Sequence, residues 1–403
     1  MSCGSSETRA SCCGGGSSSQ DQINPNSATE VYDSVKDYYG KRLQGSDDLK
    51  TSACTTGASA MPRYIRQAIA EVHDEVVKRY YGCGLVVPQL LQDAHVLDLG
   101  SGAGRDCFVV SKLVGEKGKV VGVDMTEEQL QVARQHIEYH RDKFGLSKSN
   151  VEFRHGYIEK LGEAGLEDGT FDVIMSNCVI NLVPDKEAVL RESYRVLRDG
   201  GELYFSDVYS SAIVPDDLRK DAVLWGECIS GALYWEDLIS LAKKVGFATP
   251  RLVRAAPIDM NTEEMQAKLG DLRFVSATYR LVKVPVSEQE AKSQKVTYNG
   301  GALNNPDELE FDQTVSFPAQ TAVTVSAAVT AILRSSRFAR YLSFADAPCC
   351  APTPADPDLN PFVLSDRTPA AAASGGGCCG GGTGSSTDKD STGCGPPAKK
   401  SCC

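Results

Sequence analysis

The chain has 403 residues, which is long for one domain and sufficient for two domains with tails. Its 42 basic and 53 acidic residues give a formal net charge of -11, so nucleic acid is not expected as a partner. The N-terminus lacks the apolar stretch of a secretory signal, and the run AVTVSAAVTAIL is too short to span a bilayer. We therefore expect a cytoplasmic protein that does not bind membranes, with an organelle transit peptide as the open alternative.

Composition divides the chain into four parts. Residues 1–29 and 346–403 are rich in Gly, Ser, Pro and Cys, and we expect them to be disordered tails. Residues 30–249 alternate between strand-like and helix-like patterns and form the informative domain. Residues 250–345 form a smaller C-terminal domain, in which the run TYRLVKV predicts a strand.

Strands and helices alternate in order along the first domain. HVLDLG (95–100) predicts a strand, followed by a glycine turn and a helix that begins in SGAGRDC. KVVGVD predicts the next strand, and Thr126 with Gln129 has the spacing of a capping box for a helix that ends at Gly145. FDVIMSN, a helix over about 186–198 and GELYFSD continue the pattern. The alternation predicts an α/β fold with a doubly wound, mostly parallel sheet.

The first turn is a candidate ligand site. Gly100, Gly102 and Gly104 have the spacing G-x-G-x-G, which differs from the G-x-G-x-x-G of dinucleotide enzymes. Glycines let the backbone approach a ligand closely, and such sheets bind ligands at the carboxyl ends of their strands. Asp124 ends the second strand, where a carboxylate accepts hydrogen bonds from ribose hydroxyls. The pattern predicts a nucleoside without pyrophosphate; glycines of an ordinary tight turn and a surface aspartate are the alternative.

The chain contains 15 cysteines, which fall into groups by context. Cys107 lies in a helix-like segment and is expected in the core. Ten others lie in Gly/Ser/Pro-rich sequence: Cys3, Cys12, Cys13, Cys349, Cys350, Cys378, Cys379, Cys394, Cys402 and Cys403. Cys54, Cys83, Cys178 and Cys228 lie in patterned sequence without C-x-x-C spacing, so a zinc ribbon is not expected. Each of these four alone also fits a small buried side chain.

The segments LDLGSGAGRD and VGVDMTEEQL resemble the cofactor-binding part of class I S-adenosylmethionine methyltransferases. Together with SNCVINLVPDKEAVLRESYRVLRDGGELYFSDVY, they resemble the arsenite methyltransferase family, over about residues 40–345. The resemblance implies a class I methyltransferase-like fold for residues 30–249 and a small α+β domain for residues 250–345. The family also has cysteines in the regions of Cys54, Cys83, Cys178 and Cys228.

The resemblance implies a set of cofactor-binding residues. The glycine turn faces the methionine part of S-adenosylmethionine, Asp124 binds the ribose and Met125 lies against the adenine. Tyr157 and Ile158 hold the adenine edge, and Tyr81 lies near the sulfonium. The full set is Tyr81, Asp98, Gly100, Gly102, Gly104, Asp124, Met125, Tyr157, Ile158, Asn177 and Val179.

The four patterned cysteines match the chemistry of trivalent arsenic. Arsenic is a soft centre that binds three thiolates and keeps a lone pair. Methyl transfer needs that lone pair held in line with the methyl carbon. By the resemblance, Cys178 and Cys228 are permanent ligands, Cys83 is the third and Cys54 exchanges. It also implies a Cys54–Cys83 disulfide during turnover, which thioredoxin or glutathione reduces. The implied substrate is arsenite or its glutathione conjugate.

Several residues receive no functional assignment. Arg105 and Asp106 fit a helix cap or the surface as well as a ligand contact. The histidines have no ligand spacing and are expected to be solvated: His73, His136, His140 and His155. The vicinal cysteine pairs of the C-terminal tail fit low-complexity sequence better than an arsenite relay. The terminal Lys-Lys-Ser-Cys-Cys does not fit a four-residue prenylation box.

Two other functions stay open. The first is methylation of a small organic acceptor, with incidental cysteines. The second is sequestration of soft metals by a thiol-rich protein without turnover. The glycine turn with Asp124 favours an enzyme, because a sequestering protein has no use for a methyl donor. We expect a monomer.

Overall fold

The computed structural model describes residues 22–42, 61–82, 86–259, 263–347 and 358–367. Two of the four candidate arsenic ligands, Cys178 and Cys228, lie in these ranges. Cys54, Cys83 and the vicinal pairs Cys349–Cys350, Cys378–Cys379 and Cys402–Cys403 lie outside the described residues.

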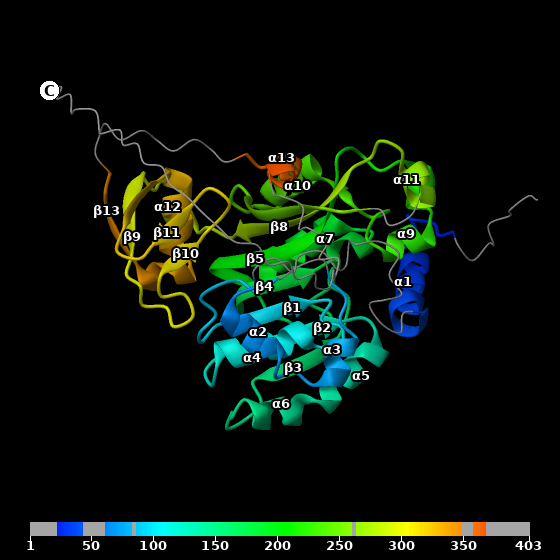
Figure 1. Cartoon of the computed structure of the whole chain (residues 1–403), viewed down its shortest axis with the longest axis horizontal. Coiled ribbons are helices and arrows are strands. Elements are labelled where there is room, and N and C mark those ends of the chain that lie inside the picture. Colours follow the sequence, from blue (N-terminus) through cyan, green and yellow to red (C-terminus); the bar gives the residue numbers. More distant parts are fainter. Residues whose placement is uncertain (1–21, 43–60, 83–85, 260–262, 348–357, 368–403) are drawn as a thin grey trace, which may run out of the picture. The chain divides into compact units, whose positions relative to one another are not determined.

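The central element is an eight-stranded mixed sheet in the order β3-β2-β1-β4-β5-β8-β7, with β6 paired to β5 (Figure 1). β1 to β6 pair with one another in parallel, whereas β8 is antiparallel to both β5 and β7. This confirms the α/β fold and the mostly parallel sheet. The strands are β1 (His95–Leu99), β2 (Lys119–Asp124), β3 (Val151–His155), β4 (Phe171–Asn177), β5 (Leu197–Ser210), β6 (Leu233–Tyr234), β7 (Arg251–Pro257) and β8 (Phe274–Val282).

Helices cover the sheet through apolar faces. α4 buries Cys107 and Phe108 in one core cluster, whereas α7 buries Val189 and Leu190 in another. The helices between β1 and β8 are α4 (Arg105–Val114), α5 (Glu127–Gln135), α6 (Ile137–Lys143), η4 (Ile180–Leu182), α7 (Lys186–Val196), α8 (Asp216–Arg219), α9 (Ala222–Gly226), α10 (Trp235–Val245) and α11 (Glu263–Leu269).

Helices N-terminal to the sheet also pack on it. They are α1 (Ala28–Asp37), η1 (Tyr38–Arg42), α2 (Arg63–Ile69) and α3 (Asp74–Lys78). Ser27 caps α1 by accepting the amide N–H of Glu30. Val31 and Val35 then pack in the cluster that contains Cys178 and Cys228, so the N-terminal helix joins the segments that carry the two cysteines.

A second, smaller fold follows β8. Its three-stranded antiparallel sheet has the order β12-β9-β13, and a two-stranded sheet pairs β10 with β11. Val296 of β9 and Ile332 of α12 share a core cluster. The elements are η5 (Val286–Glu288), β9 (Gln294–Tyr298), β10 (Glu308–Glu310), β11 (Ser316–Pro318), β12 (Ala322–Val325), α12 (Ala327–Ser335), η6 (Arg337–Tyr341) and β13 (Leu342–Asp346). The smaller α+β unit is as predicted, and AVTVSAAVTAIL divides into β12 and α12 at the Ser326 cap.

Strand pairing bears on the predicted domain boundary near residue 250. β7 and β8 belong to the large sheet, whereas β9 begins the separate sheet. The boundary stays a prediction, and we favour a position after Val282. Parts of the predicted tails are ordered: Ile23 is buried, and α13 (Pro361–Arg367) packs Phe362 into the core of the large sheet. For these parts the prediction of disorder was wrong, because local apolar side chains outweigh the polar average of the tails.

Two local predictions were also wrong. The helix at Thr126 begins as predicted, but Thr126 makes no side-chain cap, and the Gln129 amide donates to the Tyr39 carbonyl instead. His140 is buried, and its ring stacks on Phe108 with centroids 3.6 Å apart. Burial lowers the pKa of His140 to about 4, so its ring is neutral. Within the described residues, no helix is both long and apolar enough to cross a membrane.

Candidate active site

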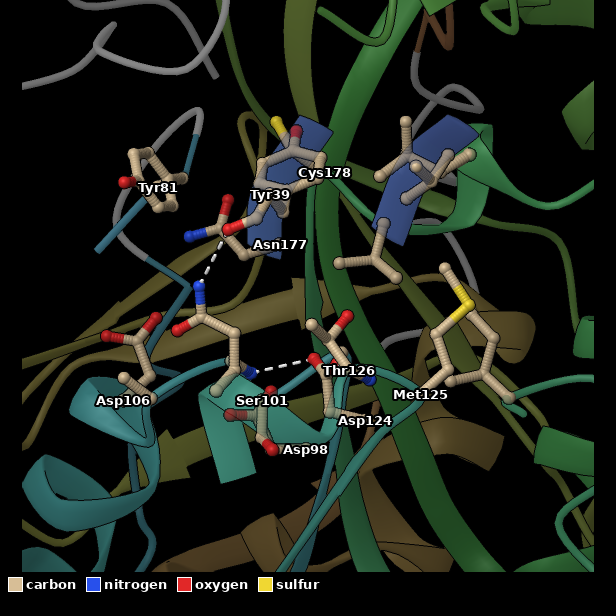
Figure 2. A pocket seen from close by; sticks show the side chains of 18 of the residues that line it. Tyr39, Tyr81, Asp98, Ser101, Asp106, Asp124, Met125, Thr126, Asn177 and Cys178 are labelled. Carbon is tan, nitrogen blue, oxygen red and sulfur yellow. Dashed lines mark hydrogen bonds between the residues drawn. The ribbon is translucent and has the colours of Figure 1, made fainter. Parts of the chain in front are cut away.

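A cavity lies at the carboxyl ends of β1, β2 and β4, where the sequence predicted the cofactor site (Figure 2). Asp98, Ser101 and Asp124 lie together at one end, and Asn177 and Cys178 lie at the other end. The sequence-predicted residues that line the cavity are Tyr81, Asp98, Gly100, Gly102, Asp124, Met125, Tyr157, Ile158, Asn177, Cys178 and Val179. Gly104 and Cys228 do not line it.

The glycine turn is shaped by positive φ angles. Gly100 has φ 71°, and a Cβ on it would lie 2.6 Å from Cγ1 of Val179. Gly104 has φ 86° and is the N-cap of α4, where a Cβ would lie 2.6 Å from the ring of Phe153. The first glycine therefore permits close contact with the β4 loop. Gly104 packs against Phe153 of β3 and does not line the cavity, and its contact with a ligand stays a prediction.

Asp124 organises the floor of the cavity. One carboxylate oxygen accepts the N–H of Gly102 at 2.9 Å, and the other accepts the N–H of Thr126 at 2.8 Å. Burial raises the pKa of Asp124, and these two backbone donors oppose that effect. The carboxylate thereby fixes the glycine turn, while each of its oxygens keeps a lone pair for a ligand hydroxyl.

Asp98, the second carboxyl group of the cavity floor, has a strongly raised pKa. Burial, and then repulsion by Asp106, raises the pKa of Asp98 to about 8, although the Cys107 thiol donates to its carboxylate at 3.2 Å. Burial therefore favours the protonated form of Asp98 more than that of a solvent-exposed aspartate. A protonated carboxyl group can donate a hydrogen bond into the cavity.

The cavity fits a nucleoside with an amino-acid tail. Ser101 Oγ and Gln129 Oε1 are buried without a hydrogen-bond partner among the described residues, and both residues line the cavity. Buried polar atoms without a protein partner can form hydrogen bonds with the polar groups of a ligand. The residues that could hold S-adenosylmethionine are thus polar at the floor and apolar or aromatic at the walls.

The aromatic wall that the N-terminal helices add to the cavity was not predicted from the sequence. Tyr32 and Tyr39 line the cavity, and the Tyr32 ring lies 5.0 Å from that of Tyr157. Lys36 Nζ donates to the Tyr157 hydroxyl at 2.9 Å. These contacts cover the cavity with α1. A sequence signal existed in the capped amphipathic segment after Ser27, but it gave no indication of where the helix would pack.

Arg105 and Asp106 also line the cavity, which favours the ligand-contact alternative over the surface alternative for both residues. The Arg105 guanidinium lies 3.0 Å from the ring centroid of Tyr80 and pairs with Asp106. The Tyr80 hydroxyl accepts a hydrogen bond from the Asn177 amide at 2.7 Å. The helix α4 is thereby connected to the residue before Cys178.

Cys178 and Cys228 are brought together although they are 50 residues apart. The Cys228 thiol donates to the Cys178 carbonyl at 3.1 Å, and both side chains are buried. Their sulfurs and a carboxylate oxygen of Asp207 lie within 4.8 Å of one another. Cys178 is disulfide-bonded, so its sulfur can bind arsenic only after that bond is reduced.

The backbone at both cysteines is unusual. Cys178 has φ 55° and Cys228 has φ 63°, a left-handed conformation that is uncommon for residues other than glycine. The Cys178 N–H donates to the Ser206 carbonyl at 2.9 Å, which holds the turn after β4. Local strain of this kind persists where the surrounding packing enforces it, and it often accompanies a functional site.

A further polar group beside the cysteines was missed in the sequence. Burial raises the pKa of Asp207 to about 6, and burial lowers the pKa of Lys186 to about 8. Lys186 Nζ donates to the Val183 carbonyl at 2.9 Å, and Asp207 accepts from the Asn181 amide at 2.8 Å. Both residues therefore fix the 178–183 segment. Asp207 is the last residue of the predicted strand GELYFSD, which was the available signal, although β5 continues to Ser210.

Gly231 allows the two cysteine segments to approach each other. A Cβ at Gly231 would lie 3.0 Å from the carbonyl carbon of Asn181 and closer still to its oxygen. We expect Gly231→Ala to push the Cys228 segment away and to weaken arsenite binding about tenfold, since overpacking costs about 1–3 kcal/mol. Arsenite titration calorimetry on the reduced protein measures this. Gly162→Ala, at a position without a positive φ where a Cβ would lie 3.5 Å from Nη2 of Arg195, should keep the wild-type affinity. Equal affinities for wild type and Gly231→Ala would contradict the packing role.

Comparisons with known proteins agree with this geometry. Residues 90–246 match the family model described as a methyltransferase domain, and residues 291–385 match the arsenite methyltransferase C-terminal domain. The chain is 51% identical to the arsenite methyltransferase of Rattus norvegicus over 341 residues, 84% of this chain and 92% of that protein. It is 52% identical to that of Homo sapiens over 311 residues, 77% of this chain and 83% of that protein.

A solved structure shows the same likeness. The crystal structure of CrArsM, an arsenic(III) S-adenosylmethionine methyltransferase from Chlamydomonas reinhardtii, superposes with a TM-score of 0.69 at 43% identity. The match covers 74% of this chain and all of that one. A bacterial relative from Aquipseudomonas alcaligenes is 51% identical, over 78% of this chain and 90% of that protein. The chain belongs to the arsenite methyltransferase family.

Proposed function

We propose that this protein methylates trivalent arsenic bound to Cys178 and Cys228, with S-adenosylmethionine as the methyl donor. The observation that carries the proposal is that Cys178 belongs to two features of the structure. It lines the cavity that contains Asp124 and the glycine turn, and its sulfur lies within 4.8 Å of that of Cys228. One residue thus belongs to both the cofactor cavity and the cysteine pair.

Arsenic binding at this pair needs reduced sulfurs and a third ligand. Each thiol that replaces a hydroxide on arsenite releases one water, so three thiols yield a tris-thiolate and three waters. Two sulfurs come from the described residues. We propose Cys83 as the third ligand and Cys54 as an exchanging one, on the strength of the family resemblance. Pyramidal thiolate ligation leaves the arsenic lone pair free.

The cavity residues then position the reaction. S-adenosylmethionine supplies a methyl group on a cationic sulfur, which is open to displacement by the arsenic lone pair. Asp124 and the glycine turn hold the nucleoside end, while the strained turn at Cys178 fixes the sulfur that carries arsenic. The protein's contribution is therefore orientation, which can supply a large part of a rate enhancement without acid or base catalysis.

Methylation leaves arsenic pentavalent, and two electrons return it to the trivalent state. We propose that Cys54 and Cys83 supply these electrons by forming a disulfide, which thioredoxin or glutathione then reduces. The reductant, the monomeric state and the cytoplasmic location remain predictions. So does the number of methyl groups transferred.

Labelled donor distinguishes this proposal from its alternatives. Reduced protein is incubated with arsenite, a thiol and S-adenosylmethionine that carries a ¹³C-methyl group. We expect labelled methylarsenicals by mass-spectrometric speciation. Label on an organic acceptor would favour the small-molecule methyltransferase, and arsenic that stays bound and unmethylated would favour a sequestering protein.

The exchanging cysteines have a separate prediction. We expect Cys54→Ser and Cys83→Ser to lose methylation of arsenite but to retain the methyl transfer itself on the monomethylated substrate, because one ligand site is then already occupied by carbon and the transfer precedes the disulfide step. Initial rates with the two substrates measure the difference. Equal loss on both substrates would show that these cysteines are required at every step.

A further inference from the structure

A second cavity, of about 290 Å³, lies away from the cysteine pair. Tyr204 of β5, Arg280 of β8 and Val253 of β7 line it, together with residues 304–308 before and within β10. Tyr64 and Ile65 of α2 complete it. The residues of the proposed methylation site do not line this cavity, so the proposed reaction does not account for it.

Arg280 is the unexplained group in this cavity. Its side chain is 2% exposed, and its Nη1 has no hydrogen-bond partner among the described residues. Its Nε lies 3.2 Å from Oε2 of Glu202, an ion pair without hydrogen-bond geometry. The guanidinium lies 5.4 Å from the Tyr204 ring centroid, 5.1 Å from that of Phe311 and 4.9 Å from that of Phe338. Ring faces stabilise the charge, but they do not accept the in-plane N–H groups in the way that a carboxylate does.

The buried charges beside Arg280 do not balance. Glu202 lies 3.2 Å from Arg280 and 2.6 Å from Arg337, so one carboxylate faces two guanidinium groups. Arg337 also donates to the carbonyl of Gln89, which satisfies it further. Asp312 is already bound by Arg251 at 2.6 Å. One positive charge is therefore in excess at the inner wall of the cavity.

The exposed part of the cavity lining, its rim, carries the opposite charge. Asp307, Glu308 and Glu310 line the cavity and are exposed, and of these only Glu310 has an ion pair among the described residues, with Arg254 at 3.0 Å. An anion alone would meet repulsion at this acidic rim. A ligand with a carboxylate and an ammonium group satisfies both charges, since the carboxylate matches the planar guanidinium and the ammonium matches the rim.

We propose that this cavity binds a zwitterionic α-amino acid group, with its carboxylate on Arg280 and its ammonium at Asp307 and Glu308. The ligand is either a free amino acid or the γ-glutamyl end of a short peptide. The site is separate from the methyl-transfer cavity, and the proposal does not depend on the proposed function.

Calorimetric titration with small probes tests this site. L-alanine is expected to bind, whereas acetate and ethylamine, which each carry one of the two charges, should bind much more weakly. S-methylglutathione has a γ-glutamyl end but no free thiol. Tighter binding of S-methylglutathione than of L-alanine would identify a peptide ligand, and weaker binding would identify a free amino acid.

Rim variants supply the control. Asp307→Asn combined with Glu308→Gln should weaken L-alanine binding about tenfold, because both changes remove charge at exposed positions without affecting Arg280. Glu290→Gln, another exposed acid outside the cavity, should bind L-alanine as the wild type does. Arg280→Lys should abolish binding; if it fails to fold, the rim variants decide. Failure of L-alanine to bind, acetate binding as tight as L-alanine binding, or an unchanged affinity in the rim variant would overturn the proposal.

Discussion

Cys228→Ser is expected to reduce methylation of both arsenite and monomethylated arsenic to below about 1% of the wild-type rate. Serine offers a hard oxygen that does not replace a thiolate on a soft arsenic centre. The fold should tolerate the change, because the serine hydroxyl can donate to the Cys178 carbonyl as the Cys228 thiol does at 3.1 Å. Initial rates with each substrate, together with thermal unfolding, separate lost chemistry from lost structure. Cys178→Ser should give the same loss.

Cys107→Ser is the matched control for this substitution. Cys107 is also buried, and its thiol also donates a hydrogen bond, to Asp98 at 3.2 Å, which a serine hydroxyl can replace. It lies in α4, away from the cysteine pair, and it should retain methylation. If Cys107→Ser loses as much activity as Cys228→Ser, or if Cys228→Ser stays active, the assignment of Cys228 as a ligand is wrong.

Asp124→Asn is expected to weaken the binding of S-adenosylmethionine about a hundredfold. The Asp124 carboxylate accepts the N–H groups of Gly102 and Thr126, one at each oxygen. An amide has only one acceptor oxygen, so one backbone donor faces an NH₂ group, at a cost of about 1–3 kcal/mol in addition to the lost ligand contact. Titration calorimetry measures the affinity directly, without turnover.

The same variant should leave arsenite binding intact, because the sulfurs of Cys178 and Cys228 are held by other contacts. Glu127→Gln is its control: it removes one charge from a neighbouring, exposed side chain that pairs with Arg134. This control should bind S-adenosylmethionine as the wild type does. Unchanged cofactor affinity in Asp124→Asn would show that the glycine turn keeps its binding conformation without the Asp124 carboxylate.

The floor of the cavity was predictable because its parts are local in sequence. Gly100 follows one buried strand and Asp124 ends the next, and adjacent parallel strands bring their carboxyl ends together. Physical reasoning on the turn and the acid therefore indicated a nucleoside site. The pairing of Cys178 with Cys228 was not derivable in this way, since 50 residues separate them; it came from the family resemblance.

The walls of the cavity were not predictable for a related reason. Tyr32 and Tyr39 look like ordinary core aromatics in sequence, and only the packing of α1 brings them to the cavity. Lys186 occupies the first position of α7, where a lysine usually lies in solvent. Its burial follows from the turn after Cys178, whose carbonyls accept its ammonium. Long-range packing, absent from any local pattern, decides each of these positions.

Predictions of disorder and of solvent exposure were also wrong for some short segments. A window that averages over the Gly/Ala-rich C-terminus hides Phe362, whose ring is buried against the large sheet. His140 was misjudged because a histidine at the end of an amphipathic helix resembles a solvated one. Its neighbours Phe108 and Phe144 provide an apolar environment that only the fold assembles.

Arsenic K-edge X-ray absorption on the reduced protein with one equivalent of arsenite tests the central claim most directly. The account predicts an inner shell of three sulfurs in the wild type. It predicts that oxygen replaces one sulfur in Cys228→Ser, whereas Cys107→Ser keeps the wild-type spectrum. An oxygen-containing shell in the wild type, or an unchanged sulfur shell in Cys228→Ser, would contradict arsenic ligation by the cysteine pair at the methyl-donor cavity.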